Sequence, residues 1–375
     1  MTPLAHNGTV WSNTTAGDSN WYNYNNQRWA NARDNNHNMF VWIPRYAYRI
    51  AYFDNSSNAN ARRANPAHTD GLLGFSTRHG MIEVDPISGD TNLVTGTLPT
   101  NVTGNVQTTA FSDYIPHPAF TFNSQRAGIW VGKYTTGFTG TVPGNANAPT
   151  RVVIQEGIRM WRSINASNMF LTATNFANPS TNGITGTSIM MRNRDWGAVA
   201  YLSHSGFGRN GELVTINDNS DFITGHGGNN ASTTGNATGV FDMRGGAWEG
   251  KAAYVNNGNA SLTDNASSIV GAGARYKDVY PVGSSDASAN NYLASRNIVG
   301  NAVFETSTSG DGPGGAWFGA VCWFPDTTRP VFVRGGLWSA GSNAGVFSTT
   351  LWNRLCECEY WFPCSGSPIA DLILD

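Results

Sequence analysis

The segment from Val333 to Phe347, VRGGLWSAGSNAGVF, limits what this chain can fold into more than any other part of its sequence. Its glycines disfavour a helix, because glycine loses more backbone freedom on folding than any other residue. Its apolar residues do not alternate with polar ones, so it also lacks the pattern of a regular half-buried strand. The chain therefore has to hold a large aromatic side chain, Trp338, on irregular backbone.

Uncharged polar residues have to carry most of the solubility of this chain. Charged residues make up 13% of the 375 residues, and the formal net charge is −2 without any basic run. Nucleic-acid binding needs clustered positive charge, so we expect no nucleic-acid partner. Hydrophobic residues make up 40%, which is enough for a core. We see no apolar run long enough to span a membrane, and the first residues lack a signal-peptide pattern.

The strand patterns are short and separated by polar segments. Residues 39–50 and 127–137 are rich in aromatic and β-branched residues, and Pro44 interrupts the first of these runs. Residues 54–109 have few apolar anchors and are expected to form loops with short strands.

Two helices are predicted. Residues 154–170 place apolar side chains at helical spacing. The second helix is expected to have Asn193 as its N-cap, Asp195 in its first turn and Gly206 at its end. Residues 206–265 are dominated by glycine and asparagine and are expected to form long loops. Together these patterns predict an α+β fold with much irregular backbone.

Three short motifs resemble chemical sites, but simpler explanations fit each one better. Ser203–Ser205, with its central His204, lacks the sharp turn of a nucleophile elbow, and His204 is better explained as a partner of a helix dipole. Gly310–Gly315 lacks the lysine and hydroxyl ending of a phosphate loop, and we expect it to deliver Trp317 to a surface. Asn217–Asp221 could donate oxygens to a structural calcium ion, although Asx-turns explain it as well.

The four cysteines do not form a metal pattern. They are Cys322, Cys356, Cys358 and Cys364, and no histidines accompany them at zinc-ligand spacing. We therefore predict no catalytic residues, no metal ligands and no cofactor, apart from the calcium alternative.

Two motifs carry a resemblance to a known family. GVFDMRGGAWEG, residues 239–250, is similar to the G-[VI]-[YW]-D-M-x-G-N-V-W-E-W motif of formylglycine-generating-enzyme-like (sulfatase-modifying factor) proteins, a branch of the C-type lectin fold. This chain has Gly246 where that motif has Asn and Gly250 where it has the last Trp. RGGLW, residues 334–338, looks like the R-G-G-S-W of the same proteins. The order of the matching pieces, from about Trp21 to Phe347, resembles the variable proteins of diversity-generating retroelements.

The resemblance implies a fold and a division of the chain. It implies one C-type-lectin-like domain over residues 1–375, α+β in class, with two main helices, short antiparallel strands and long irregular insertions. Residues 1–60 would be a strand-rich segment packed on that domain. Residues 330–350 would be the variable binding region, and residues 351–375 an atypical tail.

It also implies a function, which is the display of side chains for binding. In that group a reverse-transcriptase system rewrites chosen codons, while the glycine framework of the fold stays constant. The positions that match the variable part, or border it, are Leu337, Trp338, Ser339, Ala340, Ser342, Ser348 and Thr349, with Trp317 as a neighbouring candidate. The partner would be a protein or glycan on a host or target cell, and the protein would lie on a virion tail or an extracellular cell surface. The oligomeric state stays open.

Two other functions remain as alternatives. One is a formylglycine-generating enzyme or pseudo-enzyme, whose cysteine pair would be expected soon after RGGLW. The interval from Ser339 to Phe347 holds no cysteine, so the prediction is that the protein is not an enzyme. The other alternative is a lectin that binds sugar through calcium.

The tail departs from the family ending, a strand of the type GFRVV. Suitable synonymous codons for residues 351–368, read one nucleotide forward, give FGTGYASASIGFRVVVAP, which has that ending. We therefore hypothesise that the coding frame slips between Phe347 and Leu351, and that the three tail cysteines carry no function. Codons that cannot give GFRVVV in the shifted frame would end this hypothesis.

Overall fold

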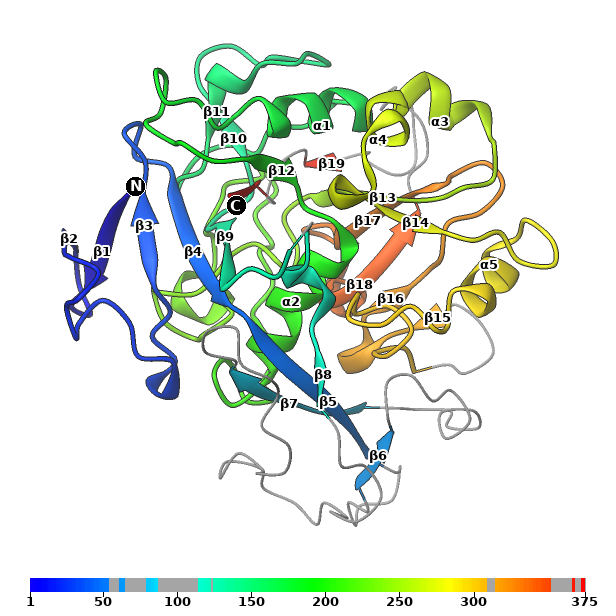
Figure 1. Ribbon diagram of the computed structural model, residues 1–375, viewed down its shortest axis with the longest axis horizontal. Helices are drawn as coiled ribbons and strands as arrows, with labels where there is room; N and C mark the ends of the chain where they lie inside the picture. Colours follow the sequence, from blue (N-terminus) through cyan, green and yellow to red (C-terminus); the bar gives the residue numbers. More distant parts are fainter. Residues whose placement is uncertain are drawn as a thin grey trace.

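The computed structural model describes residues 1–53, 61–64, 79–86, 114–122, 124–308, 314–351, 366–367 and 372–374. These residues form a mixed α+β structure with a few helices and several mainly antiparallel sheets, as the sequence predicts. Figure 1 shows two larger sheets around a central helix. The cysteines at positions 356, 358 and 364 lie outside the described residues, so the frame-slip hypothesis for the tail stays a prediction.

The first sheet has seven strands in the order β12-β20-β9-β4-β3-β1-β2. In chain order they are β1 (Thr2–His6), β2 (Trp11–Asn13), β3 (Asn31–Arg33), β4 (Met39–Pro44), β9 (Gly128–Gly132), β12 (Ser188–Met190) and β20 (Leu372–Leu374). Each neighbouring pair is antiparallel. The predicted strand over residues 39–50 breaks at Pro44, where β4 ends; proline cannot donate to a ladder.

The second sheet contains the RGGLW motif and has the order β14-β13-β17-β18-β16-β15, with β19 also beside β13. Its strands are β13 (Trp248–Val255), β14 (Asp278–Tyr280), β15 (Gly314–Gly315), β16 (Val321–Cys322), β17 (Val331–Gly335), β18 (Gly345–Leu351) and β19 (Gly366–Ser367). β17 and β18 pair antiparallel, so the loop between them leaves and re-enters the centre of the sheet.

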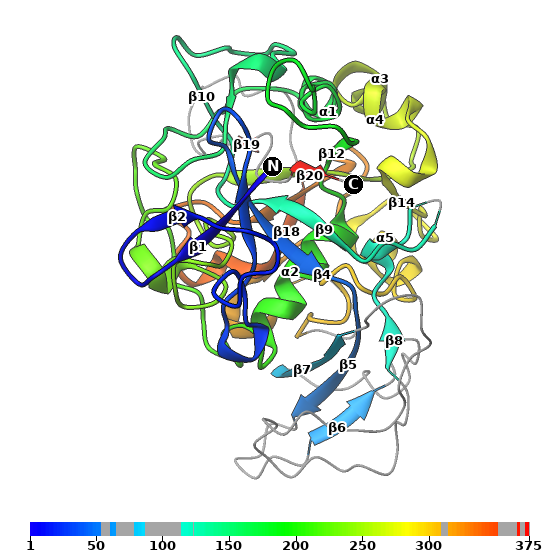
Figure 2. The same ribbon diagram turned by 60° about the vertical axis from the view of Figure 1, so that its left-hand side comes forward.

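Two smaller sheets complete the fold. β5 (Tyr46–Phe53) pairs with β6 (Ala61–Ala64), β7 (His79–Pro86) and β8 (Ile115–Pro116), and Figure 2 shows this sheet below the larger ones. β10 (Gly137–Phe138) pairs with β11 (Val152–Val153).

The central helix is α2 (Asn193–His204), and every one of its residues except Arg194 is buried. It contacts β4 of the first sheet and β13 of the second, and both views place it in the middle of the molecule. Arg192, rather than the predicted Asn193, is the N-cap. The Asp195 carboxylate accepts from the backbone N–H of Arg192 at 2.8 Å, as in a capping box.

The helix predicted over residues 154–170 is mostly wrong. α1 spans only Ala166–Thr174, and Asn165 caps it by accepting from the backbone N–H of Asn168. Ile154, Trp161 and Ile164 are buried, but they lie on non-helical backbone before the cap. Apolar spacing reports which side chains are buried, and here irregular backbone buries them. The remaining helices are short: α3 (Ala260–Asn265), α4 (Ser267–Gly271) and α5 (Ser288–Ala294).

A buried carboxyl group lies where β5 meets α2. Glu305 is 1% exposed and accepts hydrogen bonds from the Tyr48 hydroxyl at 2.8 Å and the Tyr201 hydroxyl at 2.7 Å. Burial raises the pKa of Glu305 to about 7, because a low-dielectric interior disfavours its charged form. Burial lowers the pKa of the neighbouring His117 to about 3. His117 therefore makes the protein less stable as the pH falls, which is opposite to the effect of Glu305.

We predict that Glu305 makes the protein less stable as the pH rises. The raised pKa means that folding favours the protonated acid, so this stabilisation is complete below the unfolded pKa and is lost towards pH 7. Between about pH 5.5 and pH 7.5 the wild type should lose about 2 kcal/mol relative to Glu305→Gln. Urea denaturation across this range measures the difference, and the comparison cancels the contribution of His117. If the free energy of unfolding changed with pH by the same amount in both proteins, Glu305 would not be the group responsible.

Candidate ligand-display loop

The loop of residues 336–344, between β17 and β18, is fixed by glycines. Gly335, Gly336 and Gly341 have φ values of 86°, 99° and 57°, in the left-handed region that side chains disfavour. A Cβ on Gly336 would lie 2.5 Å from the Cα of Ala344, so the two ends of the loop approach too closely for any other residue. These three glycines therefore occupy backbone conformations in which another residue would be strained.

The loop is joined to the second motif, residues 239–250, through backbone hydrogen bonds. The Trp338 N–H donates to the Gly246 carbonyl at 2.8 Å, and the Gly245 N–H donates to the Gly335 carbonyl at 3.2 Å. Gly245 and Gly246 also have positive φ values, 84° and 67°. The two segments that carry the resemblance thus support one another.

Two side chains hold the returning end of the loop by its carbonyls. The Trp196 indole N–H donates to the Val346 carbonyl at 2.6 Å. The Arg244 guanidinium donates to the Ala344 carbonyl at 3.0 Å and to the Val214 carbonyl at 2.8 Å. Loop carbonyls that have no ladder partner need such donors when they are buried, so these contacts keep the backbone in one conformation.

A buried carboxylate orders the segment beneath the loop. Asp242 accepts from the Asn217 side-chain amide at 2.8 Å and from the Gly225 N–H at 2.9 Å. Burial raises the pKa of Asp242 to about 7, against the effect of these hydrogen bonds. Asn217 is thus committed to Asp242, and Asn219 accepts from the Asp221 N–H at 2.9 Å in an Asx-turn. Within the described ranges, no three His, Cys, Asp or Glu side chains form a group that could hold a metal ion.

The structure divides the predicted contact residues into two sets. Ser339 and Ser342 are exposed, and Trp338 and Ala340 are half-buried, so these four can reach a partner. Four others are buried: Leu337, Ser348, Thr349 and Trp317. These four residues belong to the core, so the prediction that they lie on the contact surface is wrong.

Each buried residue has a clear reason for its position. Leu337 packs with Met160, Phe222 and Ala247 and anchors the start of the loop. Trp317 packs against Phe347, with ring centroids 5.4 Å apart, instead of standing on a surface.

Ser348 and Thr349 lie in β18 between β17 and β16, where both faces of the strand are covered. Within the described part of the chain, neither hydroxyl has a hydrogen-bond partner. Such hydroxyls are costly to bury.

The sequence did not reveal one exposed residue of the loop, nor the residues on which Trp338 rests, of which Phe222 is buried and Arg162 is half-buried. Asn343, which matches the constant part of the motif, is exposed. Phe222 lies edge-on to Trp338 at 6.5 Å, and the Arg162 guanidinium lies 3.8 Å from the centroid of Phe222. Arg162 and Phe222 are far from the loop in sequence and carry no local motif, so only the tertiary fold brings them to it.

The other motifs have structural roles. Ser203 and Ser205 donate to the carbonyls of Thr233 and Leu202, and the His204 ring packs against Trp317 at 5.3 Å. Cys322 is buried, and burial raises the pKa of its thiol to about 12. This thiol stays protonated and unreactive at neutral pH.

Comparisons with known proteins add no relative: no family model matches this chain, and no curated protein matches it. Among the described residues, no helix is both long enough and apolar enough to cross a membrane.

We predict that the loop tolerates change in its exposed side chains but not in its framework. Gly336→Ala should destabilise the fold by about 2 kcal/mol or more through strain and the clash with Ala344. Leu337→Ala should cost a similar amount by emptying its cluster. Ser339→Tyr, the matched exposed change, should shift the free energy of unfolding by less than about 0.5 kcal/mol. Denaturant unfolding measures all three, and equal costs for Gly336→Ala and Ser339→Tyr would refute the framework.

Proposed function

We propose that this protein is a ligand-display protein of the diversity-generating retroelement type, on a C-type-lectin-like, formylglycine-generating-enzyme-like scaffold. The observation that carries the proposal is the loop of residues 336–344. Its backbone is held by positive-φ glycines and by donors from Trp196 and Arg244, while Ser339, Ser342 and Asn343 are exposed. A loop of this kind can exchange outward side chains without changing its backbone.

The contact set in this proposal is Trp338, Ser339, Ala340, Ser342 and Asn343. Trp338 supplies most of the contact area, because a half-buried indole offers a large surface at small entropic cost. Its packing on Phe222 limits its motion further. The small residues beside it leave the indole accessible and offer hydroxyl and amide groups for hydrogen bonds.

The partner in this proposal is a protein or glycan on a host or target cell, and the protein acts on a virion tail or an extracellular cell surface. The formal net charge of −2 gives no strong electrostatic preference, so shape and aromatic contact would decide specificity. Binding is proposed rather than catalysis. The resemblance places the cysteine pair of the enzymes soon after RGGLW, and residues 339–347 contain no cysteine.

The nucleotide sequence around the gene tests the proposal. We expect a reverse-transcriptase gene nearby, together with a near-copy of the region that encodes Val333–Phe347. The two copies should differ at codons for Trp338, Ser339, Ala340 or Ser342, at positions where the near-copy has adenine. The codons for Gly335 and Gly336 are the internal control and should be identical. Absence of the near-copy, or differences that fall on the glycine codons, would reject the proposal.

A further inference from the structure

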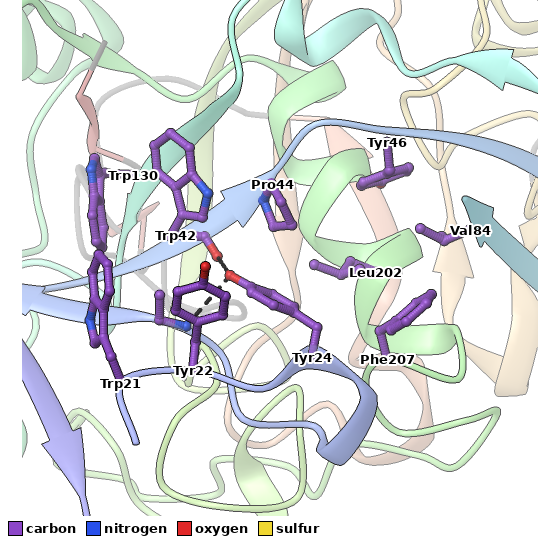
Figure 3. Close-up of a pocket in the computed structure, with 11 residues that line it drawn as sticks. Trp21, Tyr22, Tyr24, Trp42, Pro44, Tyr46, Val84, Trp130, Leu202 and Phe207 are labelled. Atoms are coloured by element: carbon purple, nitrogen blue, oxygen red, sulfur yellow. Dashed lines mark hydrogen bonds between the residues drawn. The ribbon is translucent and has the colours of Figure 1, made fainter. Parts of the chain in front are cut away.

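A pocket of about 430 Å³ lies beside the first sheet, and none of the residues that line it belongs to the loop of residues 336–344. Its size is within the range of small-ligand sites. Its walls come from the loop before β3, from β4 and β9, and from the end of α2, as Figure 3 shows. It is lined by Trp21, Tyr22, Tyr24, Ala30, Trp42, Pro44, Tyr46, Val84, Trp130, Leu202 and Phe207.

The lining presents aromatic rings and very little else. None of the lining residues is charged. The polar ends of three of them are used inside the protein. The Tyr24 hydroxyl donates to the Trp42 carbonyl at 2.7 Å, and the Tyr46 hydroxyl donates to the Ala198 carbonyl at 2.7 Å. The Trp21 indole N–H donates to the Asn31 carbonyl at 2.8 Å.

Two pairs of rings meet at steep angles, while Trp21 and Trp130 are stacked at 30° with centroids 6.4 Å apart. Tyr22 lies edge-on to Trp21, with centroids 5.4 Å apart and planes at 73°. Trp42 and Trp130 lie 5.2 Å apart at 57°. In Figure 3, Trp21 and Trp130 stand together on one side, with Trp42, Tyr22 and Tyr24 beside them. Rings that meet at such angles can direct several of their electron-rich faces towards one space.

This chemistry selects among ligands. A primary ammonium or a guanidinium would lose its hydration without receiving acceptors from the lining. A sugar needs several polar partners, and this lining offers few. A quaternary ammonium group is weakly hydrated and cannot donate hydrogen bonds, and the faces of Trp and Tyr attract it through their quadrupoles. A purely aliphatic ligand would gain nothing from indoles and phenols over aliphatic side chains.

We propose that this pocket binds a quaternary ammonium group of the choline or trimethyl-lysine type. Trp21, Tyr22, Trp42 and Trp130 surround the cation. Val84, Leu202 and Phe207, at the other end of the pocket in Figure 3, receive the apolar remainder of the ligand. The inference does not rest on the proposed display function, because the pocket and the loop share no residue.

Calorimetric titration of the full chain with choline, and with its neutral isostere 3,3-dimethyl-1-butanol, tests the proposal. The two probes have the same shape and differ in charge, so we expect choline to bind at least about tenfold more tightly. Equal affinity would show a merely apolar pocket and would overturn the proposal. Failure of choline to saturate in the millimolar range would also overturn it.

Variants of Tyr22 locate the site. Tyr22 is 47% exposed, so its replacement should leave the fold intact, and thermal unfolding checks this. Tyr22→Leu should weaken choline binding about fivefold or more, whereas Tyr22→Phe, which keeps the ring, should bind within about twofold of the wild type. Trp323→Leu is the matched control, because Trp323 is 49% exposed and lies outside the lining. Loss of binding in the control, or unchanged binding in Tyr22→Leu, would place the site elsewhere and reject the proposal.

Two further titrations identify the source of the cation. Phosphatidylcholine vesicles, compared with phosphatidylglycerol vesicles, test a lipid headgroup. A peptide with trimethyl-lysine, compared with the same peptide carrying lysine, tests a modified protein. Binding in one arm identifies that source, and binding of choline alone identifies a free small molecule. Binding of the unmodified lysine peptide as tightly as the trimethylated one would contradict the proposal.

Discussion

The indole of Trp196 is the contact on which the display loop depends. It is fully buried in α2, and its N–H holds the Val346 carbonyl at the start of β18. The Lys251 ammonium of β13 lies 4.2 Å from the centroid of its ring, and the Arg334 guanidinium of β17 lies at 5.7 Å. One rigid side chain therefore positions a helix and three strands relative to each other. Lys251 also pairs with Glu249 at 3.0 Å, which offsets part of the cost of burying its charge.

The scarcity of charge in this protein makes the location of its charges informative. The buried Lys133 ammonium donates to the carbonyls of Ala237 and Gly239, and the buried Arg334 guanidinium donates to those of Asn301 and Ala302. Glycine- and asparagine-rich loops cannot pair all their carbonyls in ladders, and a buried carbonyl without a donor is costly. Buried cations satisfy several carbonyls at once. This explains how long loops can be ordered without regular secondary structure.

The sequence predicted those features that depend on local chemistry. The break at Pro44 and the helix containing Asp195 and Trp196 follow from properties of single residues or from helical spacing. Predictions failed where contacts with a remote part of the chain determine the secondary structure or the burial of a residue.

The failures have a common physical origin. Ile154 and Trp161 have helical spacing, but other segments bury them on irregular backbone, so the spacing gave the wrong element. The resemblance implies a contact-surface position for Leu337 and Thr349. The cluster around Met160 and the position of β18 between two other strands bury them instead. No pattern within a short window contains that information.

If the loop of residues 336–344 is diversified as we propose, its surface cannot keep a constant ligand from one variant to the next. Any constant recognition by such a protein has to come from residues that the scaffold itself fixes. The aromatic pocket meets this requirement, because Tyr24 and Trp42 hold each other through the bond from the Tyr24 hydroxyl to the Trp42 carbonyl, and Trp42 lies within a paired strand. Tyr46 is likewise tied to α2 through the Ala198 carbonyl. Replacing Tyr24 or Tyr46 would remove a hydrogen bond to the first sheet or to α2, whereas Ser339 is exposed on the loop. The two surfaces therefore differ in how freely their side chains can change, and that difference follows from which residues carry scaffold hydrogen bonds.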